Sequence, residues 1–217
     1  MQFALNSAVD QPTGGYTSRM KPRIPLTPGG QRVLVAAGEL FYTAGINSVG
    51  VAAVAEHAGV TKKTLYDSFG SKSELIVAYL QARHETWWDY LEQRLAAAGS
   101  PRVLTLFDAY LDHPSLNHQR GCAFLNAAAE LPAEHPGLDV IRRHKSAVQA
   151  RLAELAREDA PHASDPDELA QHLFLILEGA ITHIGVDGHS QRMQQARKIA
   201  GSLLSPQKID RARRGPD

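Results

Sequence analysis

Apolar side chains recur at intervals of three and four residues along most of this chain, the spacing of one face of an α-helix. No run of alternating β-branched residues is present to suggest a strand. Turn residues separate the periodic stretches. We therefore expect an all-α protein, with helices over about residues 28–44, 51–58, 62–69, 72–98, 101–113, 121–131, 137–159, 166–185 and 190–204.

Capping residues mark several of the expected helix starts. Thr27-Pro28 is a cap followed by proline at the first helical position. Thr61 can cap the third helix through its hydroxyl. Ser71 and Glu74 form a capping box, in which each side chain should accept the free backbone N–H of the other residue. These signals fix where the first, third and fourth helices begin.

Residues 45–72 contain two short apolar-faced helices around a small-residue turn at Gly59. Glycine readily takes the left-handed conformation that such a turn needs. Two short helices packed through alanine and valine form a helix-turn-helix. The side chains left outward on the second helix suit phosphates and base edges: Lys62, Lys63, Thr64 and Tyr66.

The run A-G-V-T-K-K-T-L-Y-D-S-F-G-S-K follows a helix that ends L-F-Y-T-A-G. Over about residues 28–80 this combination resembles the N-terminal DNA-binding domain of the TetR family of transcriptional regulators. The resemblance implies a three-helix DNA-binding domain, a helical effector-binding domain, dimerisation, and release of operator DNA when ligand binds. The chain departs from the family pattern at Val49-Gly50, at Lys63 and at Asp67-Ser68. These departures put the operator sequence in doubt rather than the fold.

The composition changes along the chain in a way that predicts four segments. Residues 1–26 contain Gly14-Gly15 and three prolines without a helical stripe, and we expect a disordered arm. We expect the helix-turn-helix DNA-binding domain over 27–72, a helical effector-binding and dimerisation domain over 73–204, and a flexible tail over 205–217. In the arm, three basic residues could touch phosphates or remain uninvolved: Arg19, Lys21 and Arg23.

The recognition helix carries the candidate DNA contacts. Base edges are the expected partners of Lys62, Lys63 and Thr64. Phosphates are the expected partners of Thr61, Tyr66 and Lys72, the last of these at the start of a helix, where its dipole also favours an anion. The alternative is a solvated polar face on an ordinary pair of helices.

The family resemblance places an effector pocket within the fourth to eighth helices. The candidate lining residues are Trp87, Trp88, Phe107, Tyr110, Cys122, Asn126, Glu130, His172, Phe174, Glu178 and His183. Aromatic residues at helical spacing also occur in ordinary cores. The polar members on apolar helices need partners, which could be a ligand, a water or another helix. A mixed aromatic and polar lining suggests a medium-sized organic effector.

Other chemistry receives little support from the sequence. His172 and His183 share a helical face but lie about 16 Å apart along the axis, and no histidines are spaced one turn apart, so we expect no metal site. His144 is grouped with the histidines in or beside helix ends and loops. Cys122 could sense oxidants only as an exposed thiolate, and its apolar neighbours favour burial. We find no phosphate loop, nucleophile elbow or paired-carboxylate motif, and expect neither catalysis nor a cofactor.

Charge and cysteine content fit this interpretation. The chain of 217 residues has a formal net charge of zero, but residues 21–83 hold seven basic and four acidic side chains, so the positive charge gathers toward the DNA-binding end. A single cysteine excludes an intrachain disulfide. We see no signal peptide and no apolar run near the length of a membrane span, and we expect a cytoplasmic protein.

Two hypotheses from different classes follow. The first is a ligand-responsive transcriptional regulator, a repressor that binds a palindromic operator as a homodimer through its last two helices and is released by a small organic effector. A variant of it is an activator, or a repressor without a small effector. The second is a helical small-molecule-binding or enzymatic bundle whose N-terminal domain mediates protein contacts.

Overall fold

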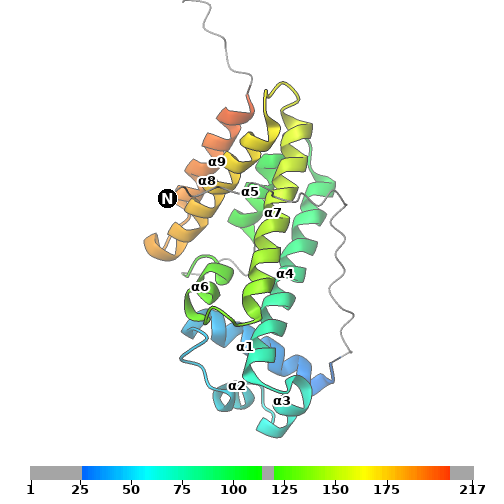
Figure 1. The fold of residues 1–217 in the computed structure, drawn as a ribbon, viewed down its shortest axis with the longest axis vertical. Helices are drawn as coiled ribbons and strands as arrows, with labels where there is room; N and C mark the ends of the chain where they lie inside the picture. Colours follow the sequence, from blue (N-terminus) through cyan, green and yellow to red (C-terminus); the bar gives the residue numbers. More distant parts are fainter. Residues whose placement is uncertain (1–25, 114–119, 206–217) are drawn as a thin grey trace, which may run out of the picture.

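The computed structural model describes residues 26–113 and 120–205, which fold into nine helices without a strand (Figure 1). The helices are α1 (Pro28–Ala44), α2 (Val51–His57), α3 (Lys62–Phe69), α4 (Lys72–Ala97), α5 (Arg102–Asp112), α6 (Ala123–Glu130), α7 (Gly137–Asp159), α8 (Pro166–Asp187) and α9 (Gln191–Leu204). The all-α prediction is confirmed. The predicted arm contacts at Arg19, Lys21 and Arg23 lie outside the described residues.

The helix starts follow the capping signals, with one exception. Thr27 and Thr61 each accept a backbone N–H from three residues further on, over 3.1 Å. Ser71 accepts the N–H of Glu74 over 3.0 Å, but its own N–H donates to the Phe69 carbonyl over 2.8 Å. The capping box is therefore confirmed for the Ser71 side chain and wrong for the Glu74 side chain. The Ser71 N–H, which Glu74 was predicted to accept, already donates to a carbonyl in the turn after α3.

Helices α1, α2 and α3 form the base of the molecule in Figure 1. Leu65 is the buried residue of α3 and has no exposed surface. The start of α1 lies so close to α3 that a Cβ on Gly29 would be 2.9 Å from the Thr64 methyl carbon. Only glycine fits there without a shift, so α1 fixes the position of the recognition helix directly.

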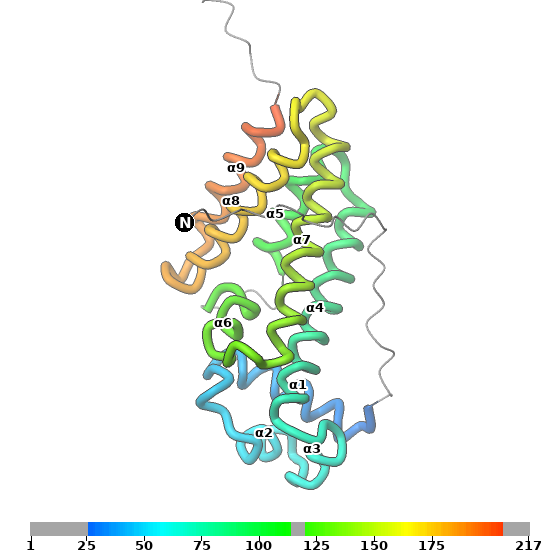
Figure 2. The backbone as a smooth tube through the Cα atoms, viewed as in Figure 1, coloured from blue at the N-terminus to red at the C-terminus, as the bar shows by residue number. Residues whose placement is uncertain are grey.

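Helices α4 and α7 pack along each other from this base to the far end of the molecule (Figure 2). Helix α5 packs against both of them and against α9. The side chains at this junction are fully buried and include Leu91, Phe107 and Leu152. The result is a continuous apolar core that joins the base to the remaining helices.

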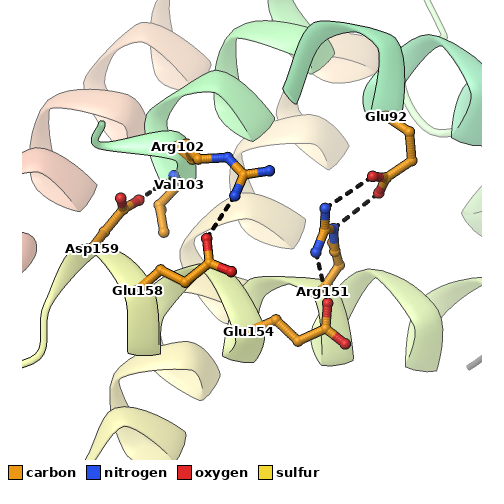
Figure 3. A network of polar contacts seen from close by, with 7 residues as sticks. All are labelled: Glu92, Arg102, Val103, Arg151, Glu154, Glu158 and Asp159. Atoms are coloured by element: carbon orange, nitrogen blue, oxygen red, sulfur yellow. Dashed lines mark hydrogen bonds and ion pairs between the residues drawn. The ribbon is translucent and has the colours of Figure 1, made fainter. Parts of the chain in front are cut away.

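Ion pairs and a capping contact reinforce the far end of this core (Figure 3). Arg151 of α7 donates two hydrogen bonds of 2.9 Å to Glu92 of α4 and one of 2.7 Å to Glu154. Helix α5 has no side-chain cap of its own, and Asp159 of α7 accepts the Val103 N–H instead, over 2.6 Å. Three helices are thereby tied together through polar groups of α7.

Helix α8 contradicts the expectation that no apolar stretch of the chain approaches the length of a membrane span. It has 22 residues and is long and apolar enough to cross a membrane by length and composition alone. In the fold it packs on α7 and α9, and its Glu178 forms an ion pair with Lys145 of α7. It leaves Leu175 and Val186 exposed, and these lie eleven residues apart and so on one face. The apolar character of α8 is that of a core helix with a second, uncovered face.

Helix α6 lies between the base and the upper helices (Figure 2). It begins two residues later than predicted because Gly121 takes a positive φ of 65° and turns the chain. A Cβ on Gly121 would be 2.8 Å from the Ile181 carbonyl of α8, and one on Gly185 would be 2.7 Å from the Arg120 carbonyl. Two glycines thus allow the segment that enters α6 to lie directly on α8.

Candidate nucleic-acid interface and ligand cavity

The recognition helix α3 presents most of the predicted DNA contacts to solvent. Thr61, Lys62, Lys63 and Tyr66 are exposed, and Tyr66 keeps 46% of its surface accessible. Thr64 is half-buried against α1, and its hydroxyl lies 3.0 Å from that of Thr61. The structure brings these five residues together on α3 and its N-cap. Their exposed groups are donors and acceptors that suit phosphates and base edges.

Lys63 has an acidic neighbour on the same helix. Its Nζ lies 2.7 Å from the Asp67 carboxylate, one helical turn away, and both side chains are largely exposed. Such a pair contributes little to stability in water, so DNA can replace it at small cost. Asp67 was noted in the sequence only as a departure from the family pattern. In the structure it sits beside a predicted base contact.

Lys72 is bonded within the protein. Its Nζ donates to the Ile46 carbonyl over 2.7 Å, and the side chain is half-buried. This contact ties the start of α4 to the turn between α1 and α2. Lys72 therefore holds the base together from a position next to α3, in addition to its predicted role toward phosphate.

A cavity of about 480 Å³ lies between α1 and side chains contributed by helices α4 to α8. Helix α1 contributes one wall through Val35, Gly38 and Tyr42, and α4 contributes another. The volume is in the range of small-molecule sites. Seven of the lining residues carry rings, including two histidines: Tyr42, Tyr79, Trp87, Tyr110, His113, Phe124 and His144.

Three of the predicted lining residues line this cavity: Trp87, Tyr110 and Cys122. Phe107 is fully buried in the core, and Trp88 and Phe174 are partly buried against it. His172 is exposed. His183 is half-buried, with its Nδ1 at 3.8 Å from the Asp187 carboxylate. These five side chains do not line the cavity.

The three polar candidates are bonded to other parts of the protein. Asn126 donates to the Arg120 carbonyl over 2.7 Å. Glu178 accepts two hydrogen bonds from Lys145, over 2.5 and 2.7 Å. Glu130 reaches across to the base, as described below. Each of these three polar side chains is therefore hydrogen-bonded to another part of the chain.

Cys122 is buried and shares the ammonium group of Lys145. The Lys145 Nζ donates to the Cys122 Sγ over 3.5 Å while it also pairs with Glu178. Cys122 is 5% exposed and is the N-cap residue of α6, where it lines the cavity. The predicted burial of this cysteine is seen in the structure.

His144 differs from its expected place. The sequence predicts a place in or beside a helix end or loop, but His144 lies within α7 and is buried. Its ring stacks on Phe124 at 3.7 Å, and its Nδ1 lies 3.0 Å from the Nδ1 of His84. Burial, followed by the nearby charge of Lys145, holds the pKa of His144 well below its usual value, so the ring is neutral. Its spacing from Ile141 and Val148 was the signal that could have placed it on the core face.

The segment that enters α6 is bonded to the end of α1, and the last residue of α6 is bonded to the turn that follows α1. Tyr42 donates its hydroxyl to the Gly121 carbonyl over 3.0 Å, and Arg120 donates to the Tyr42 carbonyl over 2.9 Å. At the other end, the Asn47 backbone N–H donates to the Glu130 carboxylate over 2.8 Å, and the Asn47 side chain donates to the Glu130 carbonyl over 3.0 Å. A helix that lines the cavity is thereby tied to the segment that leads into the helix-turn-helix.

No group of three or more histidine, cysteine, aspartate or glutamate side chains that could hold a metal ion occurs within residues 26–113 and 120–205. The polar chemistry of the cavity is that of hydrogen bonds and aromatic faces. The cavity has the size and lining of a site for an organic molecule, and hydrogen bonds join α6 to the base.

Comparisons with known proteins agree with this architecture. Residues 33–79 match the bacterial regulatory proteins of the tetR family, and residues 99–200 match the tetracyclin repressor-like C-terminal domain. The chain is 28% identical over 165 residues to the HTH-type transcriptional regulator TtgR of Pseudomonas putida, which covers 69% of this chain and 77% of the relative. It is 31% identical over 115 residues to the HTH-type transcriptional activator FasR of Mycolicibacterium smegmatis, a match that spans about half of each chain (50% and 51%).

Among solved structures, the fold is similar to that of a TetR-family transcriptional regulator from Streptomyces coelicolor. The TM-score is 0.74 at 25% sequence identity, and the match covers 81% of this chain and 94% of the other.

Proposed function

The chain belongs to the TetR family of bacterial regulatory proteins, and on this basis we propose that it is a homodimeric repressor released from a palindromic operator by a small organic effector. As a family member it is a ligand-responsive transcriptional regulator with a DNA-binding N-terminal domain and a ligand-binding C-terminal domain. The matching relatives are regulators and not enzymes, which removes the enzymatic alternative. We place the boundary between the two domains at residues 72 and 73.

The exposed face of α3 supports the proposed operator contacts. We propose that Lys62, Lys63 and Thr64 read base edges, and that Thr61 and Tyr66 contact phosphates. The observation that supports this assignment is that α3 and its N-cap leave Thr61, Lys62, Lys63 and Tyr66 exposed, with the half-buried Thr64 among them. Lys72 is the weakest member of the set, because its ammonium already bonds the Ile46 carbonyl. We propose that Lys72 helps to position α3 through this bond and that the other N–H groups of its ammonium donate to a phosphate.

The uncovered apolar surface of the last two helices supports the proposed homodimer. Leu175 and Val186 of α8 are 67% and 73% exposed, and Ile199 and Leu203 of α9 are also exposed. The two helices pack on each other, so a second copy could cover both and form a four-helix interface. In a two-fold dimer each copy of α3 would read one half-site, and the two half-sites would lie about 34 Å apart on the DNA.

The cavity and its link to the base support the proposed effector response. An effector must bind more tightly to the state that does not fit DNA, because only differential affinity shifts the equilibrium. We propose that an occupied cavity displaces α6, and that Tyr42 and Asn47 carry the displacement to the helix-turn-helix. The hydrogen bonds from both residues to the α6 segment are the supporting observation.

The sign of regulation has a second candidate. FasR, to which half of this chain is similar, is a transcriptional activator. An activator with the same DNA-binding and ligand-binding parts would use the same contacts. In either case we propose a cytoplasmic protein, because its partner is the chromosome.

The test is retention of genomic fragments by the purified protein at physiological salt, followed by sequencing. We expect enrichment of one short palindrome, with the logarithm of affinity falling linearly with the logarithm of salt concentration. Transcription from the enriched promoter, with and without the protein, then separates repressor from activator. Uniform or absent retention by a folded dimer would contradict the operator-binding proposal.

A further inference from the structure

Two neighbouring polar groups at the cavity have no hydrogen-bond partner. They are the indole Nε1 of Trp87 on α4 and the hydroxyl of Tyr110 on α5, and their rings lie 4.9 Å apart. Both side chains are more than nine-tenths buried, and both line the cavity. Within the described residues only two other buried side-chain atoms share this condition, on Asp159 and His183, and neither residue lines the cavity.

Their chemistry indicates what kind of group is missing. The indole nitrogen can only donate a hydrogen bond, so its partner must be an acceptor. Burial raises the pKa of Tyr110 well above its usual value, so its hydroxyl keeps a hydrogen to donate. A buried donor without an acceptor carries an unfavourable free energy, and native structures leave few such groups. Each of the two groups can therefore donate a hydrogen bond to an oxygen of a bound molecule.

The charges around them indicate that the bound group is neutral. Lys145 is paired with Glu178, so neither leaves a net charge beside Cys122. His144 is held neutral by burial. Arg83 and Glu39 also line the cavity and have opposite signs, and the Arg83 guanidinium lies over the Tyr42 ring. The lining therefore has no excess charge to offset the desolvation of an ionic ligand.

We propose that the cavity takes an uncharged aromatic compound whose carbonyl or ether oxygen accepts hydrogen bonds from Trp87 and Tyr110. The ring-rich walls provide the faces against which a flat body packs. This inference names the chemical class of the effector and rests on the proposed function only in taking the cavity as the effector site. Binding of the oxygen relieves the two unpaired donors, which gives such a ligand an advantage over a hydrocarbon of the same shape.

Three naphthalene probes test the oxygen directly by isothermal titration calorimetry. They are 2-acetylnaphthalene, which has the acceptor, 2-isopropenylnaphthalene, which replaces C=O by C=CH₂ at nearly the same shape, and the anion 2-naphthoate. We expect the wild-type protein to bind the ketone about tenfold more tightly than the alkene and the carboxylate. Equal affinity for ketone and alkene, tightest binding of the carboxylate, or no binding of any probe would overturn the proposal.

Two variants locate the binding. Tyr110→Phe should reduce the preference for the ketone to about twofold or less while leaving the affinity for the alkene unchanged. Ala82→Trp, which fills the cavity from α4, should abolish binding of all three probes, whereas Arg142→Ala on the exposed surface of α7 should leave it intact. An undiminished ketone preference in Tyr110→Phe, or binding lost in Arg142→Ala alone, would place the ligand elsewhere and refute the assignment.

The ligand-free protein provides an independent measurement. Because the Tyr110 hydroxyl has no partner, Tyr110→Phe should leave the Tm unchanged or raise it by up to about 3 °C. A clearly lower Tm would show that the hydroxyl is already satisfied, and would overturn the inference. DNA retention by the wild type separates this inference from the proposed function: a ketone-selective cavity in a protein without operator binding would sink only the latter.

Discussion

The carboxylate of Glu130 accepts the backbone N–H of Asn47 over 2.8 Å, so the last residue of α6 is bonded to the turn between α1 and α2. The same carboxylate fills the space beside Gly45, whose φ of 93° sets the exit from α1. Any movement of the end of α6 must therefore displace the entry to α2 or break this contact. The contact lies outside both the cavity and the recognition helix, which makes it suited to transmit a response.

A double-mutant cycle tests this coupling without a natural effector. Ala82→Trp fills the cavity and should weaken operator binding about tenfold by mimicking a bound ligand. In a Glu130→Ala background the same substitution should weaken binding by threefold or less, because the link to the turn is gone. Fluorescence anisotropy with labelled operator measures each corner of the cycle.

Glu134→Ala, at an exposed position just after α6, is the matched control for Glu130→Ala and should leave the full Ala82→Trp effect in place. If Glu130→Ala also leaves it in place, the response travels by another route.

Lys62→Ala should alter which sequences are bound. A base contact of this kind contributes about 1–3 kcal/mol of discrimination, so affinity for the operator should fall by about tenfold or more while preference at one position relaxes. Selection from a randomised operator library measures both. Arg142→Ala removes the same charge from the exposed surface of α7 and should change neither.

Asp67→Asn should increase affinity for unrelated DNA. The carboxylate repels phosphates and holds Lys63 at 2.7 Å in the free protein. Its loss should raise non-specific affinity by about threefold to tenfold and steepen the dependence on salt by about one phosphate contact. Titrations of a non-operator duplex at several salt concentrations give the slope, and an unchanged slope would mean that Asp67 lies outside the DNA interface.

Leu175→Asp combined with Val186→Asp should yield a folded monomer. Both side chains are mostly exposed in the protomer, so the substitutions leave its core intact, but two carboxylates per copy would oppose the proposed interface. Analytical ultracentrifugation should show half the mass of the wild type, with operator affinity lost. Ala133→Asp, at an exposed loop position, should remain dimeric. A double variant that stays dimeric would require a different interface.

Stability should fall as the pH is lowered from 7.5 to 5.5. Burial lowers the pKa of both His84 and His144 in the folded protein, so below about pH 6.5 the unfolded chain binds more protons than the folded one. The free energy of unfolding should fall by up to about 1.4 kcal/mol per pH unit for the buried His144, and by less for His84, which solvent screens more strongly. Urea denaturation across this range measures the slope, and His144→Phe should flatten it. An equal slope in that variant would assign the effect to other groups.

Local signals were enough to predict the fold. Thr27 and Thr61 cap helices that depend on residues only a few positions away, and the α1 and α3 boundaries agree with the prediction. The one capping error, at Glu74, came from a local contact that the pattern did not specify, the bond from the Ser71 N–H to the Phe69 carbonyl.

The lining of the cavity could not be predicted in full, because it depends on contacts between residues far apart in the sequence. Glu130 was predicted to contact a ligand because its carboxylate needs a partner. In the structure that partner is Asn47, 83 residues earlier in the chain. Tyr42 lies in a helix assigned entirely to DNA binding, yet it lines the cavity. Trp87 and Tyr110 were predicted because they are aromatic. Their lack of partners is a property of the packed structure alone.

Helix α1 is a wall shared by two functions. One side of it positions α3 at Gly29, and another closes the cavity at Val35, Gly38 and Tyr42. The proposed effector site is therefore not confined to the proposed C-terminal domain. A chimera that joins the DNA-binding domain of a relative to residues 73–204 of this chain would carry a cavity with one foreign wall, so under our proposal such an exchange would change the effector preference as well as the operator.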